Sequence, residues 1–186
     1  MKRAVLSTLT ALALLGGVAE AGTDRGVDRA NYAIFNDVAR EVQRYVHYTI
    51  FDDVRVSVQD GTVTLTGAVT MPFKKADIDR RVARVEGVRT VRNLIAVLPV
   101  SGFDEELRYR TARAIYGNPS FWTYAAMANP PIHIVVQGGR VTLSGTVAND
   151  VDRMLARSLA SSLGALSVTN ALRTDAEVRE QLEAID

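Results

Sequence analysis

The chain has 186 residues, of which 47% are hydrophobic and 23% charged, with a formal net charge of +1 and no cysteine. This composition is typical of a folded globular protein and excludes a disordered or collagen-like chain. The near-zero charge argues against a nucleic-acid binder, which would carry a strongly basic surface, and without cysteine no disulfide framework is available.

The N-terminus has the three parts of a secretory signal peptide, which we expect to cover residues 1–21. Lys2 and Arg3 form a positive start, and residues 4–18 form an apolar run shorter than the roughly 20 residues that span a bilayer. Ala19-Glu20-Ala21 then gives a small-residue cleavage motif. We therefore expect an exported protein, periplasmic or alternatively secreted, and not lipidated because no cysteine follows the apolar run. Removing this segment leaves 20 basic and 20 acidic side chains.

The first elements of the expected mature chain are a short tail and a helix. Residues 22–30 are polar and contain glycine, which predicts a mobile N-terminus. The following residues recur at the spacing of an amphipathic helix. Its apolar side carries Phe35, Val38, Val42 and Tyr45, and its polar side carries Arg40, Glu41 and Arg44.

A hairpin pattern then occurs twice in the chain. In the first copy, residues 54–69 alternate apolar and polar positions around Asp60-Gly61, a strong signal for a two-residue turn. Residues 132–147 repeat the pattern around Gly138-Gly139, at a step of 78 residues from Gly61 to Gly139. Solenoid repeats are about 20–50 residues long. The sequence therefore predicts a duplicated small domain.

A helix and a third strand follow each hairpin. We expect the helices to begin after Thr70 and Asn149, whose side chains are suited to cap a first turn. The third strands are predicted over residues 88–98 and 168–172.

Each unit thus has the order αββαβ, and the predicted class is α+β. The predicted layout is domain 1 over 31–99, domain 2 over 100–174 and a short C-terminal helix over 175–186. Each domain is expected to be a three-stranded mixed sheet with its helices on one face. Thr174 and Glu177 have the spacing of a capping box at the start of the last helix.

This arrangement resembles the BON domain, a family named for bacterial osmotically inducible and nodulation proteins. The resemblance rests on the motif G-x-V-x-L-x-G at residues 61–67 and 139–145, and on the later V-x-x-V-x-N motif with Asn93 and its counterpart Asn170. It implies a non-catalytic envelope protein of the osmotic-stress type that binds a phospholipid membrane surface, similar to lipoprotein relatives that bind anionic phospholipid. A periplasmic protein-interaction module, or a chaperone-like binder of envelope proteins, remains the alternative.

No residue pattern indicates catalysis, a cofactor or a metal site. The chain has no P-loop, nucleophile-elbow or zinc-protease motif. His47 and His133 lie far apart in sequence, and His133 alternates with Ile132 and Ile134, so we expect it on the solvent side of its strand.

Four glycines are interpreted as structural. Gly61 and Gly139 suit the positive φ of the hairpin turns. Gly67 and Gly145 lie inside strands, which indicates a bulge or a close approach by the neighbouring helix.

The first candidate contact site is an insertion at residues 118–131, before the first strand of the second unit. It contains Trp122, the only tryptophan, with Phe121, Tyr124 and Met127 at helical spacing. The rings could complete the second core or join the two units. They could equally insert into a membrane headgroup region or a partner groove, where Trp and Tyr are favoured.

The second candidate is a basic cluster on the second helix of the first unit. Its members are Lys74, Lys75, Arg80, Arg81 and Arg84, followed by Arg89 and Arg92. Nearby acidic residues allow an ordinary solvated helix face. The alternative is a shallow patch for anionic headgroups, worth about 1 kcal/mol for each basic residue near the surface. The expected partner is a membrane phospholipid surface or an envelope protein; the oligomeric state is left open.

Overall fold

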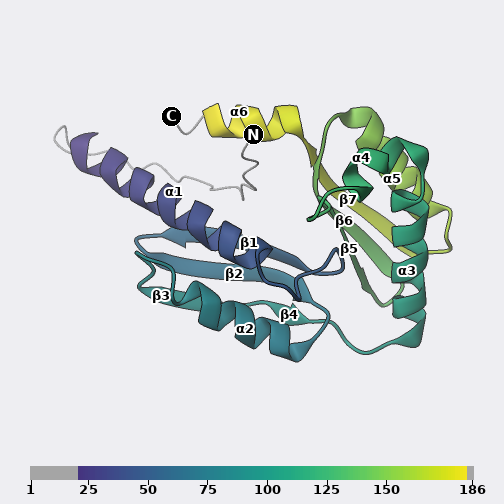
Figure 1. The fold of residues 1–186 in the computed structure, drawn as a ribbon, viewed down its shortest axis with the longest axis horizontal. Helices are drawn as coiled ribbons and strands as arrows, with labels where there is room; N and C mark the ends of the chain where they lie inside the picture. The colour runs from purple at the N-terminus through teal and green to yellow at the C-terminus, as the bar shows by residue number, and fades with distance from the viewer. Residues whose placement is uncertain (1–20, 184–186) are drawn as a thin grey trace.

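The computed structural model describes residues 21–183 as two similar αββαβ units followed by a C-terminal helix (Figure 1). Apart from Ala21, the predicted signal peptide lies outside the described residues. Residues 22–30, expected to be mobile, form instead the first turns of helix α1 (Ala21–Gln43). The two glycines in this stretch suggested a tail, but glycine in a helix costs only about 1 kcal/mol.

Domain 1 is a mixed sheet with two helices on one face. Its remaining elements are β1 (Asp53–Gln59), β2 (Thr62–Val69), α2 (Pro72–Val82), β3 (Thr90–Asn93) and β4 (Ala96–Val97). Strand β1 pairs antiparallel with β2, and both β3 and β4 pair parallel with β2. The third strand, predicted as continuous, is therefore interrupted.

Asn93 is the last residue of β3, where the third strand is interrupted. Its Nδ2 donates to Lys75 O on α2 at 3.0 Å, and its Oδ1 accepts from Ile95 N at 3.2 Å. Asn93 thus ties the third strand to the helix that precedes it. This contact gives the asparagine of the V-x-x-V-x-N motif a structural role.

Domain 2 repeats the arrangement. Its elements are α3 (Gly102–Tyr116), the 3-10 turn η1 (Pro119–Phe121), α4 (Trp122–Ala125), β5 (Ile132–Gln137), β6 (Arg140–Val147), α5 (Asp150–Ser161) and β7 (Ser167–Thr174), with α6 (Asp175–Glu183) after it. Strand β6 pairs antiparallel with β5 and parallel with β7. Asn170 Nδ2 donates to Arg153 O at 2.9 Å, as Asn93 does in domain 1. The predicted α+β class and tandem αββαβ order are confirmed.

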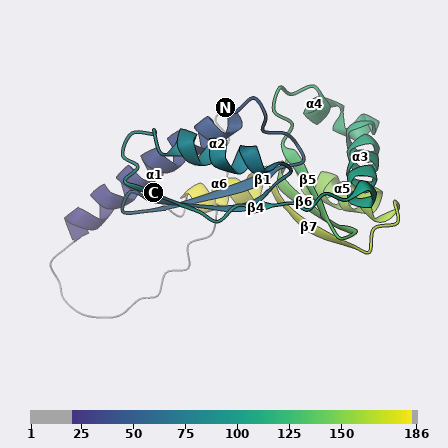
Figure 2. The same cartoon turned by 90° about the horizontal axis from the view of Figure 1, so that it is seen from below.

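Each domain has its own apolar core between its sheet and its helices. In domain 1, the inward residues of the sheet and the two helices include Val38, Val63, Leu65 and Ile78, all fully buried. In domain 2 the same layer includes Ile115, Ile134 and Leu143. Figure 2 shows α1 and α2 together on one side of the sheet of domain 1.

The two hairpin turns have the backbone expected of them. Asp60 and Gly61 have φ of 49° and 72°, and Gly138 and Gly139 have 57° and 72°, the positive values that a type I′ turn requires. The first helix of each unit holds its turn: Gly61 N donates to Asn31 Oδ1 at 3.5 Å, and the Gly138 and Gly139 amides donate to the Asp104 carboxylate at 2.8 and 2.7 Å.

The strand glycines allow a close approach, but by a strand rather than by a helix. Gly67 and Gly145 have φ of 103° and 109°. A Cβ atom at Gly67 would lie 2.0 Å from Asp53 O, and one at Gly145 would lie 1.8 Å from Pro131 O. Asp53 begins β1 and Pro131 immediately precedes β5, so the approach is made by the chain at the entry to the first hairpin strand.

Two of the three helix caps predicted from the sequence are present in the structure. Asp152 N donates to Asn149 Oδ1 at 2.9 Å, and Thr174 and Glu177 exchange both bonds of a capping box, at 2.8 and 3.2 Å. Thr70 does not cap α2, which starts after Met71 without a side-chain cap. Its hydroxyl donates instead to buried Asp52, at 2.9 Å.

Candidate functional site

Helices α1 and α2 lie side by side on the sheet of domain 1 (Figures 1 and 2). Residues of both helices and of the turns that follow them line an open groove of about 700 Å³. The groove is lined by five arginines, Arg40, Arg44, Arg80, Arg81 and Arg84, and by four carboxylates, Asp37, Glu41, Asp77 and Glu86. His47 lies at one end, edge-on to the rings of Tyr45 and Phe73, with 5.5 Å between centroids in each case.

Tyr45 forms the floor of the groove and fixes the charges around it. Its hydroxyl donates to Asp77 Oδ2 at 2.6 Å, and the Arg81 guanidinium lies 5.0 Å from its ring centroid. Arg81 also pairs with Glu41 Oε1 at 2.6 Å. Burial, and then the bond to Asp77, raise the pKa of Tyr45 to about 12. The same bond from Tyr45, followed by the charge of Arg80, lowers the pKa of Asp77.

The arginines of the groove differ in how far they are neutralised. Arg40 pairs with Asp37 at 2.7 Å, and Arg80 pairs with Asp77. Within residues 21–183, the side chains of Arg44 and Arg84 form no hydrogen bond or ion pair, and both residues are exposed. One unneutralised guanidinium therefore stands on each wall, which suits an anion held between the two helices.

The structure divides the predicted basic cluster. Arg80, Arg81 and Arg84 line the groove, whereas Lys75 does not. Lys74 belongs to the interior and not to a surface cluster, because only 6% of it is exposed. One turn after Thr70, its side chain points inward and neutralises a buried carboxylate.

That carboxylate is Asp52, which is fully buried. Lys74 Nζ lies 2.6 Å from Asp52 Oδ2. Burial opposes the ionisation of Asp52, but the hydrogen bonds from Lys74, Thr70 and Thr49 outweigh it and hold the pKa of Asp52 below its ordinary value.

Two residues of the site were not among the predicted contacts. The helical pattern placed Arg40 and Arg44 on the polar side of the first helix, but a polar helix face is by itself uninformative. Only the packing of α1 beside α2 brings these arginines opposite Arg80, Arg81 and Arg84.

The aromatic insertion is mostly core. Phe121 is fully buried and Tyr124 is 4% exposed, with their rings 5.7 Å apart, and Met127 packs against the same core. The Tyr124 hydroxyl donates to Asp152 Oδ2 on α5 at 2.5 Å. Trp122 is 73% exposed, so of these four predicted contact residues it alone has its side chain open to a partner.

Helix α4, which begins with Trp122, lies on the same side of the molecule as α1 and α2 (Figure 2). In Figure 2, α1, α2 and α4 all lie on the upper side of the two sheets. Two further exposed apolar residues, Val151 and Met154, lie on α5, which the Tyr124–Asp152 bond holds beside α4.

His133 lies on the strand face to which it was assigned, opposite to inward Ile132 and Ile134, but it is only partly exposed to solvent. The ring of Tyr48 from domain 1 packs against its ring, with 5.3 Å between centroids. Among the described residues, no three His, Asp or Glu side chains are grouped so as to hold a metal ion. Over the same range, the helices are too short or too polar to cross a membrane.

Two αββαβ units, each with a glycine-bounded hairpin and an asparagine that ties strand to helix, define a tandem-repeat protein of small α+β modules. The chain belongs to the BON domain family, whose model matches residues 36–99 and 124–176. Membership indicates a non-catalytic, envelope-associated protein.

Two solved structures are similar to the chain at low identity. One is CdsD, a structural protein of the type III secretion system of Chlamydia trachomatis, with 15% identity and a TM-score of 0.29 over 81% of this chain and 97% of that one. The other is the C-terminal domain of CdsD, with 14% identity and a TM-score of 0.27 over 73% of this chain and 94% of that one. No curated protein matches the sequence significantly.

Proposed function

We propose that the protein is a periplasmic envelope module that attaches reversibly to anionic phospholipid surfaces through the arginine groove of domain 1. The observation that carries this proposal is the pair of unneutralised arginines, Arg44 just after α1 and Arg84 just after α2, which both line one open groove. Each guanidinium has several N–H donors, and between them a phosphate oxygen would find donors from both sides of the groove.

The groove is suited to weak and reversible attachment. Its five arginines are partly offset by four carboxylates, so the site attracts anions without being strongly basic. Binding should weaken as salt rises, because exposed charges are screened over about 10 Å at 0.1 M ionic strength.

Trp122 supports a membrane rather than a soluble anion as the partner. Trp122 is exposed, and an exposed indole is favoured at the boundary between headgroups and acyl chains. In Figure 2, α4, which begins with Trp122, lies on the same side as α1 and α2. Electrostatic contact in domain 1 and apolar contact in domain 2 would then act on one surface. Such a combination gives peripheral binding without anchoring.

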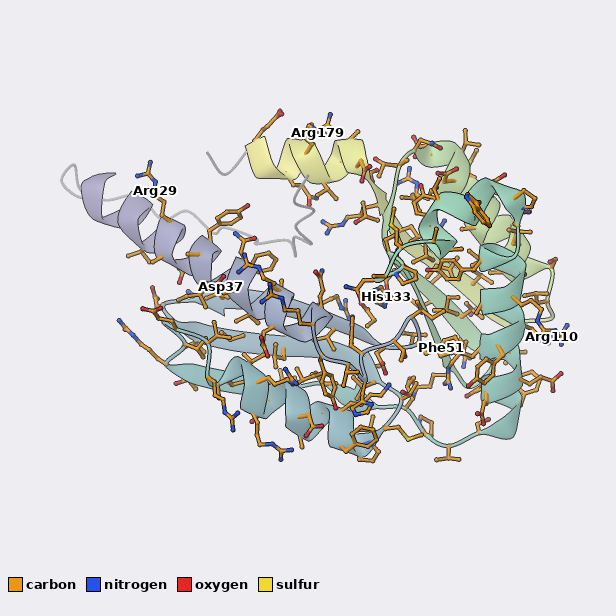
Figure 3. All side chains as sticks on the ribbon, in the orientation of Figure 1. Arg29, Asp37, Phe51, Arg110, His133 and Arg179 are labelled. Atoms are coloured by element: carbon orange, nitrogen blue, oxygen red, sulfur yellow. The ribbon has the colours of Figure 1, made fainter. Side chains whose placement is uncertain are left out.

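The test is co-sedimentation with vesicles of phosphatidylcholine, with and without phosphatidylglycerol. We expect binding only to the anionic vesicles. At roughly 1 kcal/mol for each basic residue near the surface, Arg44→Gln/Arg84→Gln should bind roughly 30-fold more weakly. Arg110→Gln/Arg113→Gln removes the same charge from exposed positions on α3 and serves as the matched control (Figure 3).

Two outcomes would contradict the proposal. Equal loss in both double variants would mean that net charge, and not the groove, governs binding. No binding of the native protein to anionic vesicles would leave the alternative class, an envelope protein-interaction module that uses the apolar surface around Trp122.

A further inference from the structure

The two domains are joined by a loop of domain 1, residues 48–52, which we call the joint loop. Ile134 N on β5 donates to Ile50 O of this loop at 2.7 Å. The Phe51 ring packs against the core of domain 2 and meets the Tyr109 ring edge-on, with 5.2 Å between centroids. A backbone hydrogen bond from β5 to domain 1 therefore connects the two domains.

The conformation of the joint loop is fixed from inside domain 1. Asp52 accepts hydrogen bonds from Thr49 N and Thr49 Oγ1, both at 2.9 Å, in addition to those from Thr70 and Lys74. The Tyr48 hydroxyl accepts from Val54 N at 3.2 Å. The loop is thus held ready for docking by contacts that do not involve domain 2.

Other backbone groups along the free edge of β5 are hydrogen-bonded to side chains of domain 2 itself. The Tyr116 hydroxyl donates to Ile132 O at 2.6 Å and accepts from Ile132 N at 3.1 Å. Arg108 donates to Val136 O at 3.3 Å. Between these two places, the Ile134 amide takes its partner from the other domain. Separation of the domains would leave both sheets intact and would expose this amide.

His133 is next to Ile134 in β5 and lies where the two domains meet (Figure 3). Its ring packs against that of Tyr48, and the nearby backbone of Asp52 and Thr49 favours the charged imidazole. In the described part of the chain, its Nδ1 is buried without a hydrogen-bond partner. A charged imidazole carries a proton on both ring nitrogens, so Nδ1 would then be a donor without an acceptor.

The charged groups around His133 come from domain 1. Asp53 and Asp52 both face the imidazole and favour its charged form. Asp52 is already paired with Lys74, and Asp53 lies 3.7 Å from Arg55. From the sheet of domain 2, the neighbouring position is Ser144, which is uncharged. Burial outweighs the two carboxylates and lowers the pKa of His133.

We propose that the contact between the two domains is an acid-sensitive latch, in which protonation of His133 releases the joint loop from β5. The docked arrangement accepts a neutral imidazole between Tyr48 and the sheet of domain 2. A proton on Nδ1 creates a buried charge and a buried donor without an acceptor, and undocking removes both by exposing the ring to water.

The direction of the pH dependence follows from the lowered pKa. In the separated state His133 titrates near the ordinary value of about 6.5, and in the docked state it titrates lower. Docking is therefore strongest above about pH 6.5 and weakens as the pH falls below it. Asp52 remains ionised across this range because its pKa is itself lowered.

The test measures the separation of the domains directly in the full chain. Because the protein has no cysteine, Ala83→Cys on domain 1 and Ser158→Cys on α5 accept spin labels specifically, and both positions are exposed. We expect one narrow distance distribution at about pH 7.5 and a broader, longer one at about pH 5. Over the same interval, the hydrogen-exchange protection factor of the Ile134 amide should fall severalfold.

Two variants assign the response to one residue. His133→Gln stays neutral at every pH and should keep the domains docked in acid. His47→Gln, which removes the other histidine of the chain, should respond as the native protein does. The latch is ruled out if the native distances do not change between the two pH values, or if His133→Gln still separates in acid.

A third measurement covers the case in which His133→Gln fails to dock at neutral pH. The Cε1 proton of His133 in the native chain can be titrated by NMR. A midpoint below about 6.5, accompanied by loss of the Ile134 protection, supports the latch. A midpoint at or above that value overturns it, because docking would then not disfavour the proton.

Discussion

Lys74 Nζ lies 2.6 Å from the carboxylate of Asp52, and the two side chains are 7% and 0% exposed. The pair ties α2 to the segment that connects α1 with β1. Removing one partner of a buried ion pair leaves the other charge uncompensated, at a cost of about 3–5 kcal/mol. We expect Lys74→Met to lower the free energy of unfolding by this amount in urea titrations. Lys75→Met, one residue away and outside the groove lining, should change it by less than about 0.5 kcal/mol.

The pH dependence of stability gives a second test of this pair. The pKa of Asp52 is lowered in the folded protein, so its contribution is present above the unfolded value of about 3.9 and is lost as the pH falls through and below it. Asp52→Asn lacks this contribution at every pH. Between about pH 6 and about pH 3, the native protein should therefore lose more unfolding free energy than the variant does. Parallel curves would show that other carboxylates are responsible.

Gly145 provides a prediction about the hairpin. Its φ of 109° and the Pro131 carbonyl, 1.8 Å from where a Cβ would lie, both exclude a side chain. Gly145→Ala should cost at least about 1–3 kcal/mol, the range for one strongly unfavourable backbone site. Gly102→Ala is the control, because it lies at the start of α3 with no heavy atom within 4 Å of the added Cβ. If both variants unfold at the same urea concentration, the crowding at Gly145 is not real.

The fold was predictable because its signals are local. The turn glycines, the alternation of the hairpin strands and the cap at Asn149 each depend on residues that are close in sequence, and each appears as expected. The duplication strengthened the fold prediction, because the same hairpin pattern occurs in both domains. Gly145 was recognised as special, but a sequence does not show which neighbouring backbone will fill the space.

The site was harder to predict because its residues meet only through packing. Arg44 and Arg84 are ordinary polar-face residues until α1 lies beside α2. Lys74 looks like its neighbour Lys75 until the buried carboxylate of Asp52 is known. His133 follows the alternation of its strand, but a loop from the other domain covers it. In each case the deciding contact joins elements far apart in the chain.

The aromatic insertion gives the last prediction, because two adjacent rings have opposite environments. Phe121 is fully buried and Trp122 is 73% exposed. Phe121→Ala should lower the unfolding free energy by roughly 3–5 kcal/mol, as for other buried phenylalanines. For a chain of this size the melting temperature should then fall by about 2–4 °C for each kcal/mol. Trp122→Ala should change the unfolding free energy by less than about 0.5 kcal/mol.

Trp122 also reports on its own environment, as the only tryptophan in the protein. Its emission in buffer should be that of a water-exposed indole, and it should shift to shorter wavelength when phosphatidylglycerol vesicles are added, because the ring then leaves water for the interfacial region. Arg44→Gln/Arg84→Gln should need more lipid to give the same shift, since the groove and Trp122 would act on one surface. If Trp122→Ala melts as low as Phe121→Ala, the ring belongs to the core. An emission that stays unchanged with lipid, while the protein still sediments with the vesicles, would restrict the membrane contact to the groove.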